Sequence, residues 1–337
     1  MAGVTDAPFR LLLRDLCGGR LGAAVSEFIS TDGCEARLLP ARAQAKFYPE
    51  ERPFGIQIFG RDPERMAAAA EALAGLNPDF LEVNAGCPVP KVAGKGGGAG
   101  LLKDLPRLAR ILREVRSRLA LPLSLKCRLG WDEESVNVLE TLKIAEDEGV
   151  EWLTVHGRTR VQGYNGLADW EKIGEVASRA KIPVIGNGDI VSAEGAVLAM
   201  KTYGVAGVGI GRGAMHNPWL FGQVADLVEG KGVLPVSARE AAGALGKFYR
   251  KMLALGFRPE GALGRLKQMA ARLCNGFSPA NPAFRQGLLT SRTAEEFLER
   301  VEAFLDTESD AYAFEPERLR NLNGEKSGEV VFGNQFK

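Results

Sequence analysis

One cysteine of this chain stands where an apolar run meets a loop of unusual glycine content. Residues 82–100 read EVNAGCPVPKVAGKGGGAG, so Cys87 precedes five glycines within fourteen residues. A free cysteine is most often a small buried hydrophobic residue. Cys87 differs because a glycine-rich loop can close over a substrate and bring the thiol to it as a proton donor. No Cys–His motif accompanies it, which favours an acid over a nucleophile.

Two cations alternate with apolar residues in SLKCRLG. Lys126 and Arg128 therefore share one face of a strand. Cations on an inward face are costly unless they meet an anion or a polar ligand, and the N1 and O2 edge of a reduced flavin would be one. Gln57, in GIQIFG, offers an amide to the same kind of ring. The alternative for Lys126 and Arg128 is a surface ion pair with acidic neighbours. Gln57 by itself does not distinguish a ring-binding role from an ordinary one.

Two glycine-rich motifs, IGNGDI and GIGRGA, end the last two strand-like runs of the chain. Backbone N–H groups in such loops can point at phosphate oxygens, and Arg212 can add a charged donor. Ordinary turn glycines with a solvated arginine are the alternative. His156 also ends a strand-like run, where it is either a core histidine or a ligand.

The elements that must position these residues are short apolar runs that alternate with helical patterns. Asp62 and Pro63 begin one helix as its N-cap and first residue, and leucines at helical spacing mark a second over 105–119. This alternation predicts parallel strands with right-handed crossovers. The predicted strands are 21–29, 53–60, 80–86, 121–130, 151–157, 182–189 and 204–213.

A (β/α)8 TIM barrel needs eight strands, and seven are visible. Only MAGVT stands where the first strand belongs, so we expect the chain to begin at the end of that strand, with the strand itself truncated. A doubly wound open sheet is the alternative. The barrel is favoured because polar residues recur where strands end, at the rim that carries barrel chemistry. They are Gln57, Asn84, Cys87, Lys126, Arg128, His156, Asn187 and Arg212.

Three segments are expected: the barrel over 1–235, a small all-α helical domain over 236–306, and a polar, disordered tail over 307–337. Thr293 and Glu296 predict a capping box at the start of one late helix. The run from Arg239 to Arg292 holds ten Lys or Arg and two Glu, which gives it +8 in a chain of net charge +1. A basic module of this kind suggests a polyanionic partner.

Five cysteines without a C-x-x-C pair, and only two histidines, argue against a metal site. We expect a cytoplasmic protein, because free thiols fit a reducing compartment and the sequence shows no signal peptide or membrane-spanning run. The oligomeric state is open, with a monomer expected.

Seven motifs in order over residues 1 to about 220 make the chain resemble the tRNA-dihydrouridine synthases, most closely the bacterial B-type. They are MAGVTDAPFR, IQIFG, VNAGCPVPKV, LKCRLGW, VHGRTRVQGY, IGNGDI and GIGRGA. The resemblance implies an FMN-dependent barrel that reduces chosen uridines in tRNA, with NADPH as the reductant. Hydride would pass to uracil C6, and Cys87 would protonate C5.

The resemblance also implies site residues. The flavin ring would contact Met1, Ala2, Gln57, Lys126 and His156. Its phosphate end would contact Asn187, Gly188, Asp189, Gly211 and Arg212. Asn84, Arg128 and Lys95 would meet the substrate base and its surroundings. Cations for the tRNA phosphates would be Lys247, Arg250, Lys251, Arg265, Lys267, Arg272 and Arg285.

Two other functions stay open at this point. One is a flavin barrel of the dihydroorotate-dehydrogenase type that acts on a free small molecule and has no need of a basic helical domain. The other is an inactive RNA-binding or chaperone protein. The sequence does not indicate which tRNA uridine would be reduced, or whether NADPH is used rather than NADH.

Overall fold

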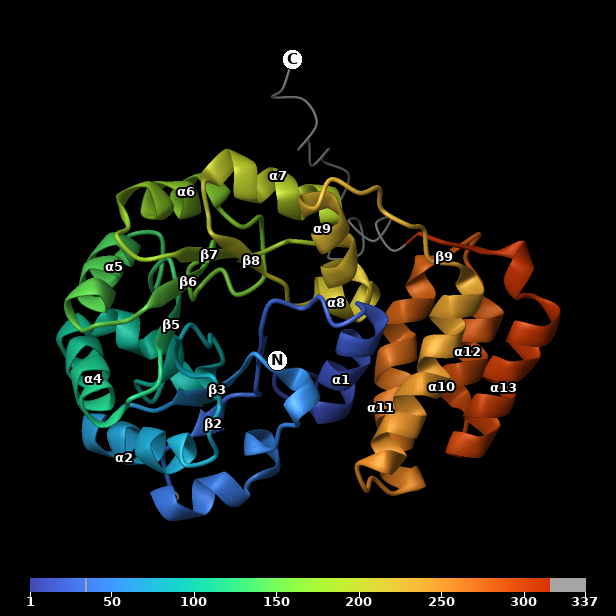
Figure 1. Cartoon of the computed structure of the whole chain (residues 1–337), viewed down its shortest axis with the longest axis horizontal. Coiled ribbons are helices and arrows are strands. Elements are labelled where there is room, and N and C mark those ends of the chain that lie inside the picture. The colour runs from blue at the N-terminus through green and yellow to red at the C-terminus, as the bar shows by residue number, and fades with distance from the viewer. Residues whose placement is uncertain (34, 316–337) are drawn as a thin grey trace. The chain divides into compact units, whose positions relative to one another are not determined.

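The computed structural model describes residues 1–33 and 35–315 (Figure 1). The chain divides into two compact units, which we call the strand unit and the helical unit. The strand unit comprises Met1–Ala7, Gly22–Ile190 and Leu198–Gly211, and the helical unit comprises Pro8–Leu21, Val191–Val197 and the chain from Arg212 onward. Within the described residues, no helix is long and apolar enough to cross a membrane.

The strand unit is built on a parallel sheet whose strands follow chain order. Two short strands, β1 and β2, share the neighbour β3, and each later strand pairs with the one before it. All seven predicted runs contain a strand. The strands are β1 (Ala24–Val25), β2 (Ile29–Ser30), β3 (Phe54–Phe59), β4 (Phe80–Ala85), β5 (Leu123–Arg128), β6 (Trp152–His156), β7 (Val184–Asn187) and β8 (Gly207–Gly209).

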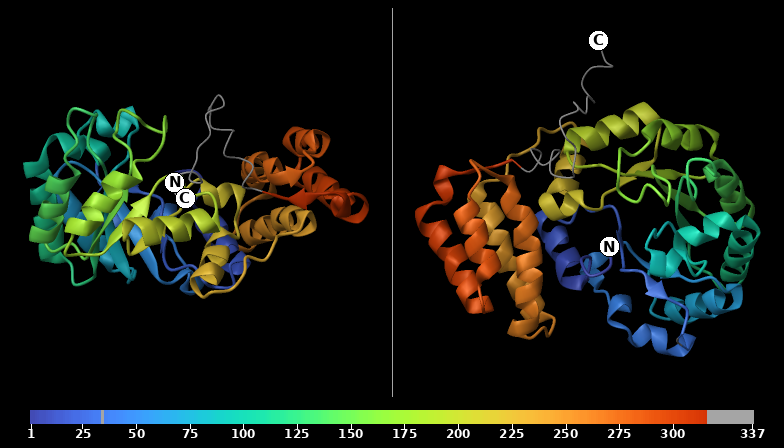
Figure 2. Two further views of the ribbon diagram at one scale, coloured as in Figure 1. Left: turned by 90° about the horizontal axis from the view of Figure 1, so that it is seen from above. Right: turned by 180° about the vertical axis from the view of Figure 1, so that it is seen from behind.

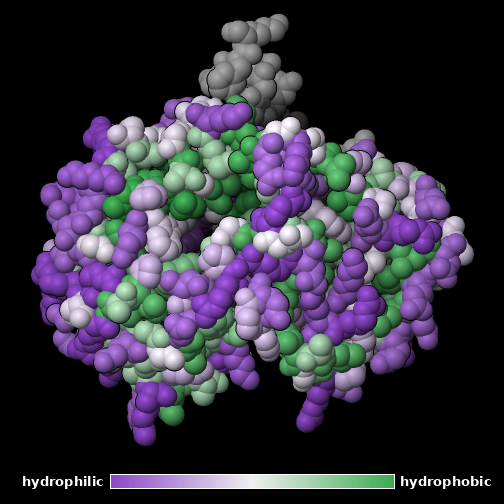
Figure 3. Space-filling view, viewed as in Figure 1, coloured by the Kyte–Doolittle hydropathy of each residue, from purple (hydrophilic) through white to green (hydrophobic). Residues whose placement is uncertain are grey.

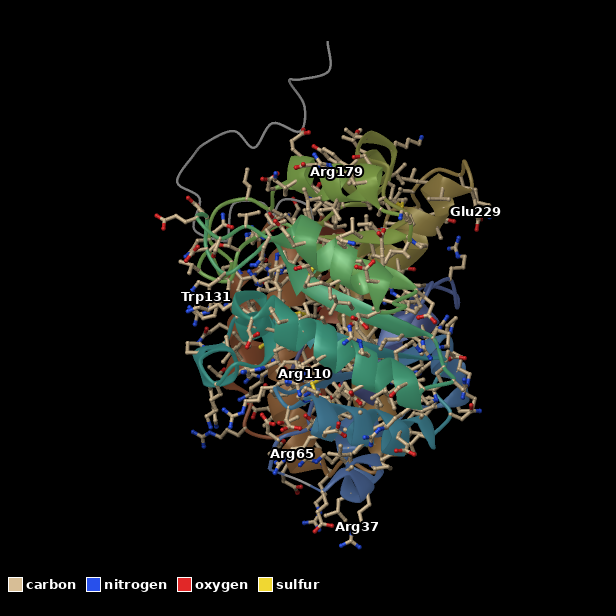
Figure 4. All side chains as sticks on the ribbon, turned by 90° about the vertical axis from the view of Figure 1, so that its left-hand side faces the viewer. Arg37, Arg65, Arg110, Trp131, Arg179 and Glu229 are labelled. Atoms are coloured by element: carbon tan, nitrogen blue, oxygen red, sulfur yellow. The ribbon has the colours of Figure 1, made fainter. Side chains whose placement is uncertain are left out.

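Helices fill the crossovers and cover the outside of the sheet, as Figures 1 and 2 show. Asp62 caps the first of them by accepting a hydrogen bond of 2.9 Å from the Arg65 backbone. Exposed Arg65, Arg110 and Arg179 lie on the outer sides of three helices (Figure 4). The helices are α2 (Pro63–Ala74), α3 (Pro90–Ala93), α4 (Leu105–Arg118), α5 (Val138–Asp147), α6 (Trp170–Arg179) and α7 (Ala193–Tyr203).

This architecture confirms a TIM-barrel-like α/β fold, since every strand pairing in the ladder is parallel and helices occupy the crossovers. Within the described residues, no pairing joins β8 to β1. The first residues lie at the carboxyl ends of those two strands. A Cβ built on Gly211, just after β8, would be 3.9 Å from the Met1 sulfur. The Gly3 and Val4 backbones donate to Glu27, between β1 and β2.

The helical unit packs helices around an aromatic core. Figures 1 and 2 show α10 to α13 lying side by side. Phe277, Phe284 and Phe304 stack there, the last two with ring centroids 4.1 Å apart. The expected late helices are present, and Thr293 caps α13 as predicted. The predicted capping box is only half formed, because the Glu296 carboxylate accepts from the Arg292 backbone rather than from the Thr293 backbone. The helices are α1 (Ala7–Leu16), α8 (Gly213–His216), α9 (Leu220–Val228), α10 (Ala238–Ala254), α11 (Pro259–Leu273), α12 (Pro282–Thr290) and α13 (Ala294–Thr307).

Two features differ from the expected segments. The helical unit takes in α1, because Phe9 of that helix packs edge-on against Phe248 of α10, with centroids 6.2 Å apart. Residues 309–314, expected in the tail, instead form a turn and strand β10 (Ala313–Phe314), which pairs antiparallel with β9 (Phe277–Ser278). Buried Phe314 anchors this strand against Trp219 and Phe277. The remaining tail, 316–337, lies outside the described residues.

Candidate active site

The polar residues singled out at the strand ends gather on neighbouring strands of the sheet. In the register, Gln57 of β3 lies beside Glu82 of β4, and Asn84 of β4 lies beside Lys126 of β5. Further along, Arg128 of β5 lies beside His156 of β6, which lies beside Asn187 of β7. Because alternate residues of a strand share a face, these side chains form one inward-facing polar layer.

A directional chain of hydrogen bonds runs through the first part of this layer. The Gln57 side-chain NH2 group donates to Glu82, and the Asn84 NH2 group donates to the Gln57 oxygen at 2.7 Å. The Asn84 oxygen in turn accepts from the backbone N–H groups of Gly86 and Cys87, at 2.9 and 2.8 Å. The turn that carries Cys87 is therefore fixed by side chains of β3 and β4.

Cys87 is buried, with 7% of its surface exposed, next to polar groups at the strand ends. Burial raises the pKa of the Cys87 thiol, while a hydrogen bond with the Val89 backbone and the charge of Arg128 act in the opposite direction. The raised pKa keeps the thiol protonated near neutral pH. That is the state a proton donor requires, and it disfavours a standing thiolate nucleophile.

The glycine-rich segment after Cys87 is packed rather than open. Gly98 has φ +53°, and a Cβ there would lie 3.0 Å from the Cys87 Cβ, the Cys87 oxygen and a Val92 methyl carbon. The Ala99 backbone donates to the Cys87 oxygen at 3.1 Å. These glycines let one stretch of backbone lie directly on another. Lys95 is exposed, and its backbone oxygen accepts from Arg61 at 3.2 Å.

Lys126 reaches across the layer to the end of β7. Its ammonium group donates to the Asn187 oxygen at 2.9 Å, and the Asn187 NH2 group donates to the Gly209 oxygen of β8 at 2.6 Å. Burial lowers the pKa of Lys126, an effect that the negative charge of Glu82 opposes. Burial also raises the pKa of Glu82, against the charge of Lys126 and the Gln57 and Ser124 donors.

Arg128 braces two loops at once. It is 1% exposed and donates to the backbone oxygen of Gly86, before Cys87, at 2.9 Å. It also donates to the oxygens of Thr159 and Gly163, in the loop after β6, at 2.7 and 2.8 Å. Its guanidinium carbon lies 5.6 Å from the ring centroid of Tyr164, which is 55% exposed. The substrate contact that the resemblance implies for Arg128 stays a prediction, and in the structure its guanidinium connects these two loops.

His156 lies beside a partly buried ion pair. The Arg158 guanidinium lies 3.3 Å from His156 Nε2 and binds both carboxylate oxygens of Asp189, at 2.9 and 2.7 Å. Since arginine can only donate, Nε2 accepts and the imidazole proton is on Nδ1. Asp189 also accepts from the Ala168 backbone at 2.8 Å. With its carboxylate engaged in this way, Asp189 could offer an anion only its backbone.

The two phosphate-loop motifs lie at the ends of β7 and β8. Gly188 has φ +133°, and a Cβ there would lie 2.5 Å from the Ala168 Cβ, so only glycine fits. Gly211 lies next to the Met1 sulfur, as described above, and Ala2 is exposed. In the helical unit, Arg212 is half-buried and is the N-cap residue of α8.

The basic residues of the helical unit divide into exposed and engaged side chains. Lys247 and Arg250 are exposed, whereas Lys251 pairs with Asp15 at 2.5 Å. Arg272 donates to the Gln268 backbone oxygen at 3.4 Å. Lys267 is half-buried. Arg265 contacts Phe248 and Gln268, and Arg285 donates to the Ala271 backbone oxygen.

Three residues of the site were not singled out from the sequence: Glu82, Arg158 and Tyr164. Glu82 stands two residues before Asn84, and that spacing places both on one face of β4. Arg158 and Tyr164 lie in the loop after β6, where no periodicity predicts which side chains turn inward. Among residues 1–33 and 35–315, no group of three or more His, Cys, Asp or Glu side chains could hold a metal ion.

The residues of the strand unit suit a flat ring with an anionic edge. Lys126, which is half-buried, presents its ammonium group, and Gln57 and Asn187 present amides, from three strands around the inward layer. Glycines follow at the ends of β7 and β8, where backbone can approach a ligand closely. The set of cation, amides and glycines matches a flavin better than it matches a metal ion.

Known proteins that are similar to this chain share one family. A family model described as "Dihydrouridine synthase (Dus)" matches residues 1–309. A "tRNA-dihydrouridine synthase B" of Pasteurella multocida is 34% identical over 91% of this chain and 91% of its own length. The protein of that name from Pseudomonas putida is 40% identical over 66% of each chain. A "Probable tRNA-dihydrouridine synthase" of Rhodobacter capsulatus is 38% identical over 68% of this chain and 71% of its own.

Proposed function

The chain belongs to the dihydrouridine synthase family, a family of enzymes, and on that premise we propose that it reduces selected uridines of tRNA to 5,6-dihydrouridine. The cofactor is FMN and the reductant is NADPH. The observation that carries the proposal is the placement of Cys87, a buried thiol held by Asn84 beside the inward layer that contains Lys126.

A reduced flavin, held by the residues of the inward layer, would supply the hydride for uracil C6. The chain must then deliver a proton to C5, and the Cys87 thiol does so, leaving a thiolate that takes its next proton from water. The raised pKa of Cys87 keeps that proton in place until the substrate arrives. The positive charge of Arg128 favours the thiolate once it forms.

The inward layer orients the ring. Lys126 would stabilise negative charge on the reduced ring, and Gln57 and His156 would contact the ring from neighbouring positions of the layer. Asn187, Gly188, Asp189, Gly211 and Arg212 are the candidates for the phosphate end, Asp189 through its backbone. Met1 and Ala2, beside the end of β8, complete the flavin contacts.

The substrate side uses the exposed rim. A target uridine must leave its base stack to reach a flat ring, and Asn84 and Arg128 border the position it would take. Lys95 and the cations of the helical unit, Lys267 and Arg272 among them, contact phosphates without reading sequence. The family match extends to residue 309 and so includes the helices that carry these cations. This favours tRNA over a free small molecule as the substrate.

The test begins with the purified protein. We expect a flavin absorption spectrum, FMN by mass analysis, and anaerobic conversion of uridine in an unmodified tRNA transcript when NADPH is added. NADH in a parallel reaction separates the two reductants. A colourless protein that binds tRNA without reducing it would refute the proposal in favour of an RNA-binding role.

The tRNA contacts have a separate test. Replacing Lys267 and Arg272 with Gln should weaken tRNA binding and make the affinity less dependent on salt, by about one phosphate contact per residue. Lys143→Gln, on α5 of the strand unit, is the control and should leave the salt slope unchanged. An unaltered slope in the double variant would show that these residues do not contact tRNA phosphates.

We further propose that the enzyme is a monomer and acts in the cytoplasm. Sedimentation at working concentration tests the monomer.

A further inference from the structure

Glu82 is a buried acidic side chain to which the proposed chemistry gives no part. It is 3% exposed, in the middle of β4, on the face of the strand that also carries Asn84. Its oxygens accept from Gln57 and, at 3.5 Å, from the Ser124 hydroxyl of β5. Burying a carboxyl group costs free energy, so we expect Glu82 to have a function that offsets this cost.

The hydrogen bonds between Glu82 and Cys87 can run in only one direction. A backbone N–H can only donate, so the N–H of Cys87 requires the oxygen of Asn84. Asn84 must then turn its NH2 group to the oxygen of Gln57, and Gln57 must turn its own NH2 group to residue 82. The chain therefore closes only if residue 82 accepts.

We propose that Glu82 is a positioning residue: its oxygen fixes the orientation of two amides in series and thereby the backbone that holds Cys87. The role rests on the proposed function only in that Cys87 is the group that must be positioned. Whether Glu82 is ionised does not change it, because a carboxylate and the carbonyl oxygen of a carboxylic acid both accept. Gln57 is oriented by the same chain, so the thiol and a flavin contact share one anchor.

Two substitutions distinguish the role of residue 82 as a hydrogen-bond acceptor from the role of its negative charge. Glu82→Gln keeps an oxygen that can accept from Gln57 but removes the charge. Glu82→Met has a side chain of similar length but no acceptor of comparable strength, so the Gln57 NH2 group is left without a partner and both amides can turn. The readout is the rate at which a small alkylating reagent modifies Cys87, followed by peptide mass mapping on the protein as purified.

We expect Glu82→Met to raise the rate at Cys87 about fivefold, the factor given by loss of about one hydrogen bond. Glu82→Gln should stay within about twofold of the wild type. Cys127, a fully buried cysteine of β5 in the same unit, is the internal reference, because its rate reports general opening of the strand unit. Equal increases at Cys87 and Cys127 would show a general loss of stability of the strand unit and overturn the proposal. The proposal would also be overturned if Glu82→Met and Glu82→Gln changed the rate at Cys87 equally, or if neither changed it.

If Glu82→Met does not fold, Gln57→Met breaks the same chain one step nearer Cys87 and should give the same selective increase. No selective increase in that variant would overturn the proposal. This measurement needs neither tRNA nor turnover. A wild-type protein that fails to reduce tRNA would refute the proposed function and leave the thiol result standing. A wild type that reduces tRNA, with variants unchanged at Cys87, would refute only the role of Glu82.

Discussion

The side-chain oxygen of Asn84 accepts a hydrogen bond of 2.8 Å from the backbone N–H of Cys87. The same asparagine donates to Gln57, so the amide uses both of its ends. Asn84→Asp keeps the acceptor but faces the Gln57 oxygen with a second oxygen. We expect this buried mismatch to lower the free energy of unfolding by about 1–3 kcal/mol in urea denaturation.

The control for that substitution is Asn165→Asp, because Asn165 is exposed. It should change the free energy of unfolding by less than about 0.5 kcal/mol. If the two variants are equally stable, Asn84 does not act through its NH2 group.

The pair of Arg158 and Asp189 should stabilise the protein because its arginine is withdrawn from water, while the Asp189 side chain is 23% exposed. Arg158 is 2% exposed and binds both oxygens of Asp189. Asp189→Asn leaves the buried guanidinium without its counter-charge, at a cost of about 2–4 kcal/mol in the free energy of unfolding. The control is Asp147→Asn, in the exposed ion pair of Lys143 and Asp147. It should lower the free energy of unfolding by less than about 0.5 kcal/mol. Similar losses of unfolding free energy in Asp189→Asn and Asp147→Asn would contradict a stabilising role for the pair of Arg158 and Asp189.

Stability in alkali should depend on buried thiols. Burial raises the pKa of Cys274 from 9.0 to about 12. Between these values the folded protein holds a proton that the unfolded chain has lost, so stability falls as pH rises above 9. We expect the stability advantage of the wild type over Cys274→Ala to shrink by about 1 kcal/mol between about pH 8 and pH 10. An advantage that stays constant would mean that the thiol titrates alike in both states.

The fold was accessible from the sequence because its signals are local. Every apolar run produced a strand, and Asp62 and Thr293 cap their helices as predicted. The placement of Asn84, Lys126 and Asn187 near one another also follows, since parallel strands end at one rim. The family assignment from the motifs is confirmed.

Contacts between segments that lie far apart in the chain could not be predicted from the sequence. Arg158 meets Asp189 across 31 residues, and Gln57 meets Glu82 across 25. No periodicity encodes either pairing. The polar composition after residue 307 likewise gave no sign that Phe314 is buried and that β10 pairs with β9. The glycines after Cys87 predict a loop that can close over a substrate, whereas in the structure Gly98 and Gly100 allow close packing of backbone on backbone.

The most direct test of the account is Cys87→Ala, examined for cofactor and product together. The variant should bind FMN with the wild-type spectrum and be reduced by NADPH, because the thiol does not hold the ring. Formation of dihydrouridine in a tRNA transcript should fall by about 100-fold or more, as expected for loss of a general acid. Product formation within about twofold of the wild type would contradict the central claim that Cys87 gives the proton to the substrate.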